Sequence, residues 1–304
     1  MATTISDNYQ IKYSEKWGSY LQQEASRLEK YVTVETGLSG RMVAYDQYGL
    51  LEFEEKNGRM RPTGLSEAPT SRRVLFPRLF SKAVGFDEFD AKQLANIDLP
   101  VSKTVEGLRA AAGRQMDRVM LDAFLGTCYT GEHGTVGVDF AADRVVPINY
   151  VESGTAAASN LTVAKLRRAL DMLMQSEAWS EDRRAYGDEL VLACSGSQIS
   201  ALLRSQEVTS YDFNTVRALA EGRVDSFLGF RIIRTELLPV DPDSGQRTCL
   251  AWVKSKAQFG IWDDFRVKIS VRDDLEETLQ VRAKFACGAT RLQEEAFVKI
   301  LCKE

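Results

Sequence analysis

His133 is the only histidine in the 304-residue chain, and it lies in the glycine-rich segment TGEHGTVG. A chain with one histidine cannot build a multi-histidine metal site, and it could support serine or cysteine nucleophiles only through that residue. Ser195 and Cys194, in the segment LACSGSQ, are the candidate nucleophiles. This segment lacks the G-x-S-x-G spacing of a nucleophile elbow, and a helix N-cap accounts better for its serines. A soluble cytoplasmic enzyme built on these three residues is therefore the least favoured interpretation.

The adjacent carboxylates are equally poor candidates for acid–base chemistry. They occur as three pairs, Asp263/Asp264, Asp273/Asp274 and Glu276/Glu277. Neighbouring residues on a strand point to opposite faces, so each pair is expected to belong to a solvated acidic loop and not to a shared site. Neither a G-x-x-x-x-G-K-[ST] loop nor a G-x-G-x-x-G segment is present in the sequence. We expect no cofactor, no metal site and no catalytic residue.

The cysteines indicate a reducing setting. They lie at positions 128, 194, 249, 287 and 302, so their number is odd and no two are closer than 15 residues. A disulfide framework or a zinc site would need closer or paired spacing, so the pattern predicts reduced thiols in a cytoplasmic compartment. Disulfides between subunits that form after cell lysis remain an alternative that spacing does not decide.

Composition excludes several classes of partner. Lys and Arg total 39 against 43 for Asp and Glu, which gives a net charge of −4 and disfavours generic nucleic-acid binding. The apolar runs are far shorter than the ~20 residues of a membrane span. The N-terminal residues MATTISDNYQIKYSEKW lack the pattern of a secretory signal.

The first forty residues are predicted to form an arm with one amphipathic helix. Ser14 can cap this helix, and its apolar stripe consists of Trp17, Tyr20, Leu21, Leu28 and Val32. The stripe ends near Gly37 and Gly40. A lone amphipathic helix has to bury its stripe, either on its own chain or on a neighbouring subunit.

Residues 42–80 are predicted to form a long two-stranded hairpin with a tip rich in turn-forming residues. Its outgoing leg is acidic, and its tip and return leg are basic. The acidic residues are Glu52, Glu54 and Glu55, and the basic ones include Arg59, Arg61, Arg72 and Arg73. Because an isolated two-stranded ribbon is marginal in water, the tip is expected to find support elsewhere. Opposite charges suit contacts that set the register with another subunit, and a solvated surface hairpin is the equal alternative.

The strongest helix in the sequence spans residues 105–125, with Gly126 as a left-handed stop. Beyond it the pattern predicts helices and strands without strict βαβ spacing, which favours an α+β fold. Helices are expected at 161–174, after Ser195 or Ser197, and at 213–222. Strands are expected at 190–194, around 230–233, at 248–253, at 265–272, and as a closing pair at 279–285 and 296–302 joined by a turn at Gly288.

This order of elements resembles the major capsid proteins of tailed bacteriophages, with the Hong Kong 97-type fold shared with encapsulins. The most telling stretches are NTVRALAEGRVDSFLGFRIIRTELLP, residues 214–239, and VRAKFACGATRLQEEAFVKI, residues 281–300. The resemblance covers nearly the whole chain. It implies an N-arm at 1–40, an extended hairpin (E-loop) at 42–80, a peripheral domain at 81–145 and 279–304, and an axial domain at 146–278.

The resemblance implies a structural protein that self-assembles through pentamers and hexamers into an icosahedral shell around double-stranded DNA. The shell would form in the host cytoplasm and become the virion capsid, without membrane contact or sequence-specific DNA binding. A portal protein and decoration proteins are implied partners, together with a separate scaffolding protein or none. The residues expected at subunit interfaces are Glu52, Glu54, Glu55, Arg59, Arg61, Arg72 and Arg73 of the E-loop, and Trp17, Tyr20, Leu21 and Leu28 of the N-arm. An encapsulin-like compartment shell is the alternative that keeps the fold.

Overall fold

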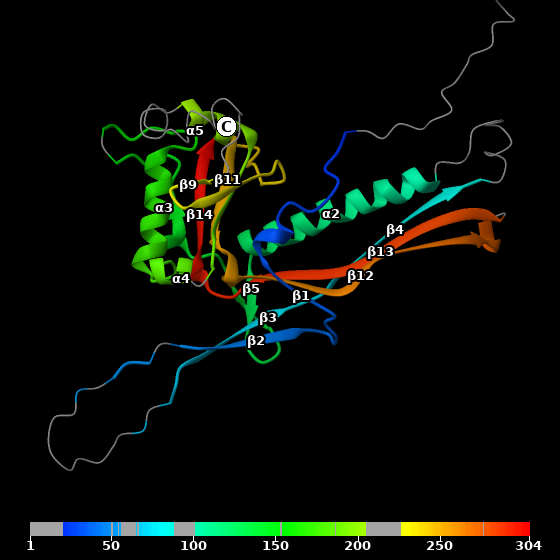
Figure 1. Ribbon diagram of the computed structural model, residues 1–304, viewed down its shortest axis with the longest axis horizontal. Coiled ribbons are helices and arrows are strands. Elements are labelled where there is room, and N and C mark those ends of the chain that lie inside the picture. Colours follow the sequence, from blue (N-terminus) through cyan, green and yellow to red (C-terminus); the bar gives the residue numbers. More distant parts are fainter. Residues whose placement is uncertain are drawn as a thin grey trace, which may run out of the picture.

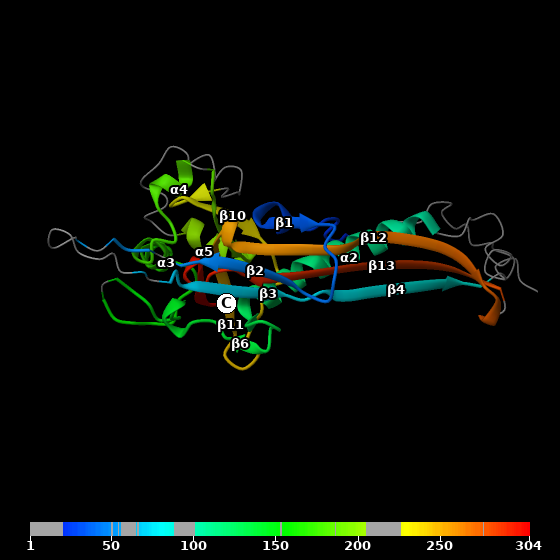
Figure 2. The same cartoon turned by 90° about the horizontal axis from the view of Figure 1, so that it is seen from below.

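A computed structural model describes residues 21–49, 51–53, 55, 65, 67–87, 101–152, 154–185, 187–204, 226–275 and 277–304. The strands in these ranges form three sheets, and the fold is a mixed α+β one, as predicted (Figure 1). The molecule is elongated: a long helix and a sheet of long strands reach one end, and a broader sheet with short helices forms the other part (Figures 1 and 2). No helix in the described ranges is long and apolar enough to cross a membrane.

The long helix, α2 (Val101–Leu125), confirms the helix predicted from periodicity and extends it by four residues at its start. With 25 residues it is roughly 37 Å long. Its inner face buries apolar side chains that recur at helical spacing, including Leu108, Val119, Met120 and Phe124. Gly126 follows the helix but is not left-handed, contrary to expectation. The helix ends instead where the side chains of Arg291 and Lys299 donate hydrogen bonds to its last carbonyl groups.

Four strands make the sheet that carries α2, in the order β1 (Thr33–Thr36), β12 (Ala257–Arg272), β13 (Thr278–Arg291) and β4 (Arg78–Phe86). β12, β13 and β4 are antiparallel, and β1 lies parallel to the first part of β12. Alternate residues of β13, Val281 and Ala283, pack with Leu108 of α2 and leave the intervening residues on the other face. Register shifts between Ile261 and Arg266 divide β12 into a buried part and a half-exposed part.

The turn predicted at Gly288 is wrong, because β13 continues unbroken through it. Gly288 pairs directly with Gly260 of β12. A Cβ atom on Gly288 would clash with the carbonyl oxygen of Phe76, so β13 needs glycine where residues 75–77 pass beside it. Direction reverses after Arg291, through the 3-10 turn η6 (Glu294–Ala296).

The second sheet has six strands in the order β7 (Val145–Val146), β14 (Phe297–Lys303), β11 (Gln246–Val253), β8 (Leu190–Cys194), β10 (Phe230–Arg234) and β9 (Ser226–Phe227). The strand predicted at Leu190–Cys194 is confirmed, and it is fully buried inside the sheet, between β11 and β10. The helices α3 (Val163–Gln175), α4 (Glu181–Ala185) and α5 (Gly196–Arg204) belong to this part of the molecule (Figure 1). The helix predicted at 161–174 is confirmed as α3, and the Thr162 side chain caps it by accepting a hydrogen bond from the Lys165 amide. The helix predicted at 213–222 lies outside the described residues.

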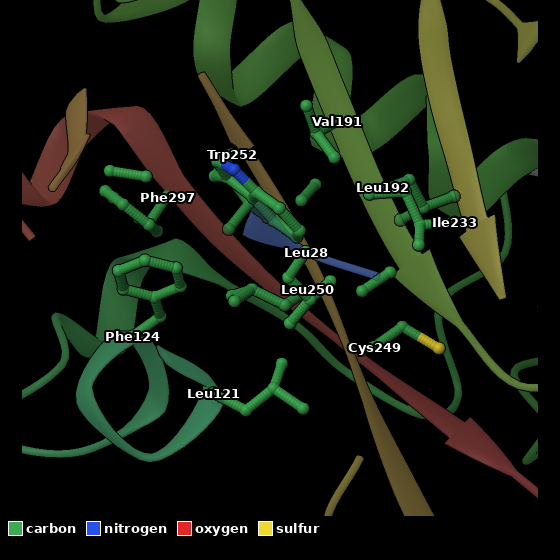
Figure 3. Packing of buried hydrophobic residues seen from close by; sticks show 14 of the residues in the cluster. Leu28, Leu121, Phe124, Val191, Leu192, Ile233, Cys249, Leu250, Trp252 and Phe297 are labelled. Atoms are coloured by element: carbon green, nitrogen blue, oxygen red, sulfur yellow. The ribbon is translucent and has the colours of Figure 1, made fainter. Parts of the chain in front are cut away.

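One hydrophobic core joins α2 to the six-stranded sheet. Figure 3 shows Phe124 and Leu121 of α2 facing Trp252, Leu250 and Phe297 of the sheet strands. The ring centroid of Phe124 lies 5.5 Å from that of Phe297 and 6.1 Å from that of Trp252. These side chains are fully buried, so the C-terminal part of the helix packs closely against the sheet.

The third sheet contains the predicted hairpin, in the order β2 (Val43–Tyr48), β3 (Thr70–Leu75), β5 (Cys128–Thr130) and β6 (Val136–Val138). β2 and β3 are antiparallel and pair from Val43 with Leu75 to Tyr48 with Thr70, which confirms the base of the hairpin. The return leg does not continue as one strand, because β3 ends at Leu75 and β4 enters another sheet at Arg78.

The helix predicted in the arm is wrong for the part of the arm that the structure describes. Residues 21–28 are not helical, and they lead into the 3-10 turn η2 (Glu29–Tyr31) and strand β1. Ser14, Trp17 and Tyr20 lie outside the described residues. Backbone amides of this segment donate hydrogen bonds to a side chain of α2, and not to carbonyl groups of the segment itself as in a helix. The periodic apolar residues alone therefore did not determine its conformation.

Strand pairing divides the chain differently from the domain boundaries expected at residue 279. β14 was expected in the peripheral domain, but it pairs in the six-stranded sheet with β11 and β7. β12 was expected in the axial domain, but it pairs with β13 and β1 beside the long helix. The four-stranded sheet beside α2 and the six-stranded sheet therefore each contain strands from both sides of the expected boundary.

Candidate functional site

The arm is fastened to the middle of α2 by the carboxylate of Asp117, which is fully buried. Its two oxygens accept four hydrogen bonds from the arm: from the side chains of Gln23 and Ser26, each at 2.5 Å, and from the amides of Arg27 at 3.0 Å and Leu28 at 3.2 Å. Hydrogen bonds to an ionised carboxylate are stronger than neutral ones, so this residue determines where the arm lies. Sequence reasoning missed it, because a single Asp in a helix carries no pattern.

Backbone contact reinforces this attachment. A Cβ atom on Gly113 would lie 2.8 Å from the Ser26 nitrogen and 2.9 Å from the Ala25 carbonyl carbon. The guanidinium of Arg114 donates hydrogen bonds to the side chain of Gln22 at 2.8 Å and to the carbonyl of Gln23 at 3.1 Å. The arm thus lies directly on the surface of the long helix.

Two of the four arm residues proposed for subunit contact can be placed. Leu28 is fully buried in the core of its own chain, beside residues of α2 and the six-stranded sheet, so it offers no surface to a neighbour (Figure 3). Leu21 is fully exposed and stays available. Trp17 and Tyr20 lie outside the described residues.

The arginines of the return leg form ion pairs within their own chain. Arg72 donates from Nε to Asp46 at 2.5 Å and from Nη2 at 2.9 Å, across the directly paired positions of β3 and β2. The adjacent guanidinium lowers the pKa of Asp46 below its ordinary value, first through these hydrogen bonds. Arg73 is largely buried and lies 3.3 Å from the Glu294 carboxylate. Both residues therefore fix the base of the hairpin in the isolated chain.

The outgoing leg has no such partners within the described residues. Glu52 and Glu55 are exposed there, and so are the neighbouring apolar side chains Leu51 and Phe53. Phe53 is 106% exposed, so no residue in the described ranges shields its ring. Glu54, Arg59 and Arg61 lie outside the described residues. An exposed segment of this composition suits contact with another chain.

A shallow hollow of about 580 Å³ lies where the hairpin meets the β5–β6 turn. It is lined by Asp46, Gln47, Tyr48, Thr70, Ser71, Arg72, Thr130, Gly131 and Glu132. Tyr48 is 82% exposed at this hollow, so its ring is offered to solvent or to a partner.

A buried cation network holds the end of α2, and sequence analysis did not find it. Arg291 is fully buried, and its Nη1 donates to the carbonyls of Ala123, Phe124 and Gly126 at 2.7–3.0 Å. Lys299 donates to the carbonyl of Leu125 at 2.8 Å. Cations at a helix C-terminus satisfy its free carbonyls and interact favourably with its dipole. The Glu294 carboxylate binds Arg291 at 2.9 Å and Arg73 at 3.3 Å, and so joins this network to the hairpin.

The enzyme candidates do not form a site in the described residues. Cys194 and Ser195 are fully buried, and Ser195 donates its hydroxyl to Glu304 at 3.2 Å. Burial raises the pKa of the Cys194 thiol to about 12, which disfavours a thiolate nucleophile. His133 is exposed in the turn between β5 and β6, in a different sheet from β8. The described residues contain no group of three or more His, Cys, Asp or Glu side chains that could hold a metal ion.

All five cysteines are free and buried. Cys249 and Cys302 lie on neighbouring strands with their sulfur atoms 3.9 Å apart. Near them the buried ammonium of Lys165 donates to the carbonyls of Ser159 at 2.7 Å and Leu301 at 3.0 Å, and burial lowers its pKa. The thiols therefore act as core side chains, and this placement gives no surface for disulfides between subunits.

Comparison with known proteins gives one family. A family model described as "Phage capsid protein" matches residues 5–304. No curated protein sequence matches the chain. Among solved structures, the chain is similar to the capsid of cyanophage P-SCSP1u, at 17% identity and a TM-score of 0.72, over 99% of this chain and 95% of that one. It is also similar to the capsid of Ralstonia phage GP4, at 13% identity and a TM-score of 0.71, over 100% and 98% of the two chains. A structure from Mycobacterium phage Che8 matches at 15% identity and a TM-score of 0.67, over 98% of each chain.

Proposed function

This chain belongs to the phage capsid protein family and is a major capsid protein of the virion shell, and on that premise we propose that its hairpin and arm join neighbouring copies in pentamers and hexamers. The observation that carries the proposal is the family match over residues 5–304, together with the Hong Kong 97-like fold of the described residues. The proposal extends to an icosahedral shell that encloses double-stranded DNA.

The exposed outgoing leg supports a contact between copies. Leu51, Glu52, Phe53 and Glu55 present apolar and acidic side chains that no described residue of the same chain covers. Among the arm residues, Leu21 stays exposed, and Trp17 and Tyr20 remain candidates for the same role. The internal ion pairs of Arg72 and Arg73 suit a second task, which is to hold the base of the hairpin in a fixed direction before a neighbour arrives.

The sheets suggest a revised division into domains. We assign α2 and the sheet β1-β12-β13-β4 to a peripheral domain, and the six-stranded sheet with α3, α4 and α5 to an axial domain. The N-arm expected at 1–40 then ends before β1, and the E-loop expected at 42–80 ends with β3. In this division the crossing from β13 to β14 joins the two domains.

The remaining partners follow from the family. We assign the chain a structural role without catalysis, assembly in the host cytoplasm, and contact with a portal protein and with scaffolding or decoration proteins. A net charge of −4 suits a shell that encloses DNA without sequence-specific binding. The free, buried thiols suit assembly in a reducing compartment.

Negative-stain electron microscopy with light scattering on the purified protein tests this function. Closed shells, or a population of pentamers and hexamers, are the expected result. Expression together with the neighbouring genes of its phage supplies any scaffolding protein. A chain that stays monomeric under those conditions as well, across salt and pH, contradicts the proposal.

A further inference from the structure

A basic sheet face lies on the side of β12 and β13 away from α2. It consists of Arg266 and Lys268 on β12 and of Arg282 and Lys284 on β13. All four side chains are exposed, whereas the intervening residues Val281 and Ala283 pack towards α2. Because side chains alternate along a strand, the four cations share one surface.

The register places like charges directly opposite each other. Arg266 pairs with Lys284, and Lys268 pairs with Arg282. Like charges in directly opposite positions destabilise a sheet, so each pair needs an anion nearby. The first pair has one, since Asp263 lies 2.9 Å from Arg266 and 3.2 Å from Lys284. Neither Lys268 nor Arg282 forms an ion pair with any residue in the described ranges.

Small residues of β4 border the basic sheet face and leave it open. Ser81 pairs with Lys284, and Ala83 pairs with Arg282, so both point to the same side as the cations. Leu79, two residues earlier on that side, is 74% exposed. The surface thus offers cations next to an exposed apolar side chain, with no bulky neighbour on β4 to cover them.

The outgoing leg of the hairpin has the complementary composition. Glu52 and Glu55 supply carboxylates, and Leu51 and Phe53 supply exposed apolar side chains within the same five residues. β2 and β3 continue towards the opposite end of the molecule from β12 and β13 (Figures 1 and 2). The leg therefore points away from the basic sheet face of its own chain.

We propose that the outgoing leg of one copy binds the basic sheet face of a second copy, with Glu52 and Glu55 beside Lys268 and Arg282 and the apolar residues beside Leu79. This inference rests on the proposed function, because it names the surface that receives the hairpin in the shell. The paired apolar and acidic character favours the leg over a nucleic acid, whose phosphates would not use Leu79. Carboxylates from the neighbour would also offset the repulsion between the positive charges of Lys268 and Arg282, which lie directly opposite each other.

A charge exchange tests the proposal. The variants are Glu52→Lys with Glu55→Lys, Lys268→Glu with Arg282→Glu, and all four changes in one chain. Each double variant is expected to lower the yield of shells about tenfold or more, and the fourfold variant is expected to recover most of it, because every copy again carries matching charges. Lys82→Glu with Arg109→Glu is the matched control: both residues are exposed, and Lys82 lies on β4 opposite Ala283, on the α2 side.

Shell yield in the double variants equal to that of the wild type overturns the inference, and so does a fourfold variant as defective as the double ones. If either result is obtained while the wild type and the control variant assemble, the basic sheet face is not the surface that binds the hairpin, and the proposed function still holds. Failure of the wild type itself to assemble counts against the proposed function.

A cross-linking experiment reads the contact without depending on charge. Glu52→Cys and Lys268→Cys in one chain are expected to give a ladder of disulfide-linked copies in a non-reducing gel of assembled particles. The five native cysteines are buried and do not compete. The pair Glu52→Cys and Lys82→Cys is the control, and an equal ladder from the two pairs, or none from the first, overturns the inference.

Discussion

The hydroxyl of Ser26 donates a hydrogen bond to the buried carboxylate of Asp117 at 2.5 Å, across 91 positions of sequence. Through this contact and its three companions, the arm of the capsid protein depends on one acidic side chain of α2. Hydrogen bonds to Asp117 therefore position the arm, and they place the Leu28 side chain in the hydrophobic core.

The first prediction concerns that carboxylate. Asp117→Asn replaces one acceptor oxygen by a donor that faces the donors of the arm, so we expect the free energy of unfolding to fall by about 2–3 kcal/mol. Urea unfolding measures the loss, and limited proteolysis should cut the arm before residue 28 sooner than in the wild type. Asp122→Asn is the control: Asp122 is exposed on the same helix, and its change is expected to stay within about 0.5 kcal/mol. Equal effects from the two variants would show that Asp117 has no special role.

The second prediction uses two glycines of one helix. Gly107→Ala should stabilise the chain by about 0.5–1 kcal/mol, because alanine favours the helix and its Cβ meets nothing within 4 Å. Gly113→Ala should destabilise it despite the same helical preference, since its Cβ would lie 2.8 Å from the Ser26 nitrogen. Thermal unfolding of both variants gives the comparison, and a stabilised Gly113→Ala variant would mean that the arm does not lie on this helix.

The third prediction concerns the end of α2. Arg291→Gln leaves three carbonyl groups of Ala123, Phe124 and Gly126 without their shared donor, so we expect a loss of about 3 kcal/mol or more. Arg109→Gln, an exposed change on the same helix, is expected to cost less than about 0.5 kcal/mol. Chemical denaturation of the purified subunit measures both values, and a neutral Arg291→Gln variant would contradict the capping role.

The fourth prediction is a pH dependence that arises from Lys165. Burial lowers the pKa of its ammonium group, so above that pKa the folded chain binds fewer protons than the unfolded chain. The unfavourable contribution of the buried charge is full below the folded pKa, and it fades as pH rises towards the ordinary lysine value of about 10.4. The stability of the wild type relative to Lys165→Met should therefore rise with pH in that window, by at most about 1.4 kcal/mol per pH unit. Unfolding curves at several pH values test this, and a constant difference contradicts it.

Much of the fold could be predicted because its main signals are local. The stripe from Leu108 to Phe124 has the period of a helix, the run Leu190–Cys194 is fully apolar, and the alternation in β12 and β13 follows the pleat of a sheet. The base of the hairpin was also predicted, because turn-forming residues separate its two strands. These elements are specified by neighbours in sequence.

The rest depends on contacts between distant residues, which no local pattern records. The apolar spacing of the arm resembles that of a helix, yet Asp117 supplies acceptors that hold residues 23–28 in an irregular conformation. Glycine is common in turns, so Gly288 predicted one. In the structure this position needs glycine because the backbone of Phe76 passes beside it and leaves no room for a side chain. The basic sheet face could not be predicted for the same reason, because only the strand register shows that Lys268 and Arg282 lie directly opposite each other.

The pair of salt bridges at Glu294 has a mechanical consequence. One oxygen of this carboxylate binds Arg73 at the hairpin base, and the other binds Arg291, which grips the last turn of α2. A pull on the hairpin by a neighbouring copy therefore reaches the end of the 25-residue helix α2 as well as the strand β3. The hairpin base and the end of α2 are thus tied together through one side chain, so a load on one is shared by the other.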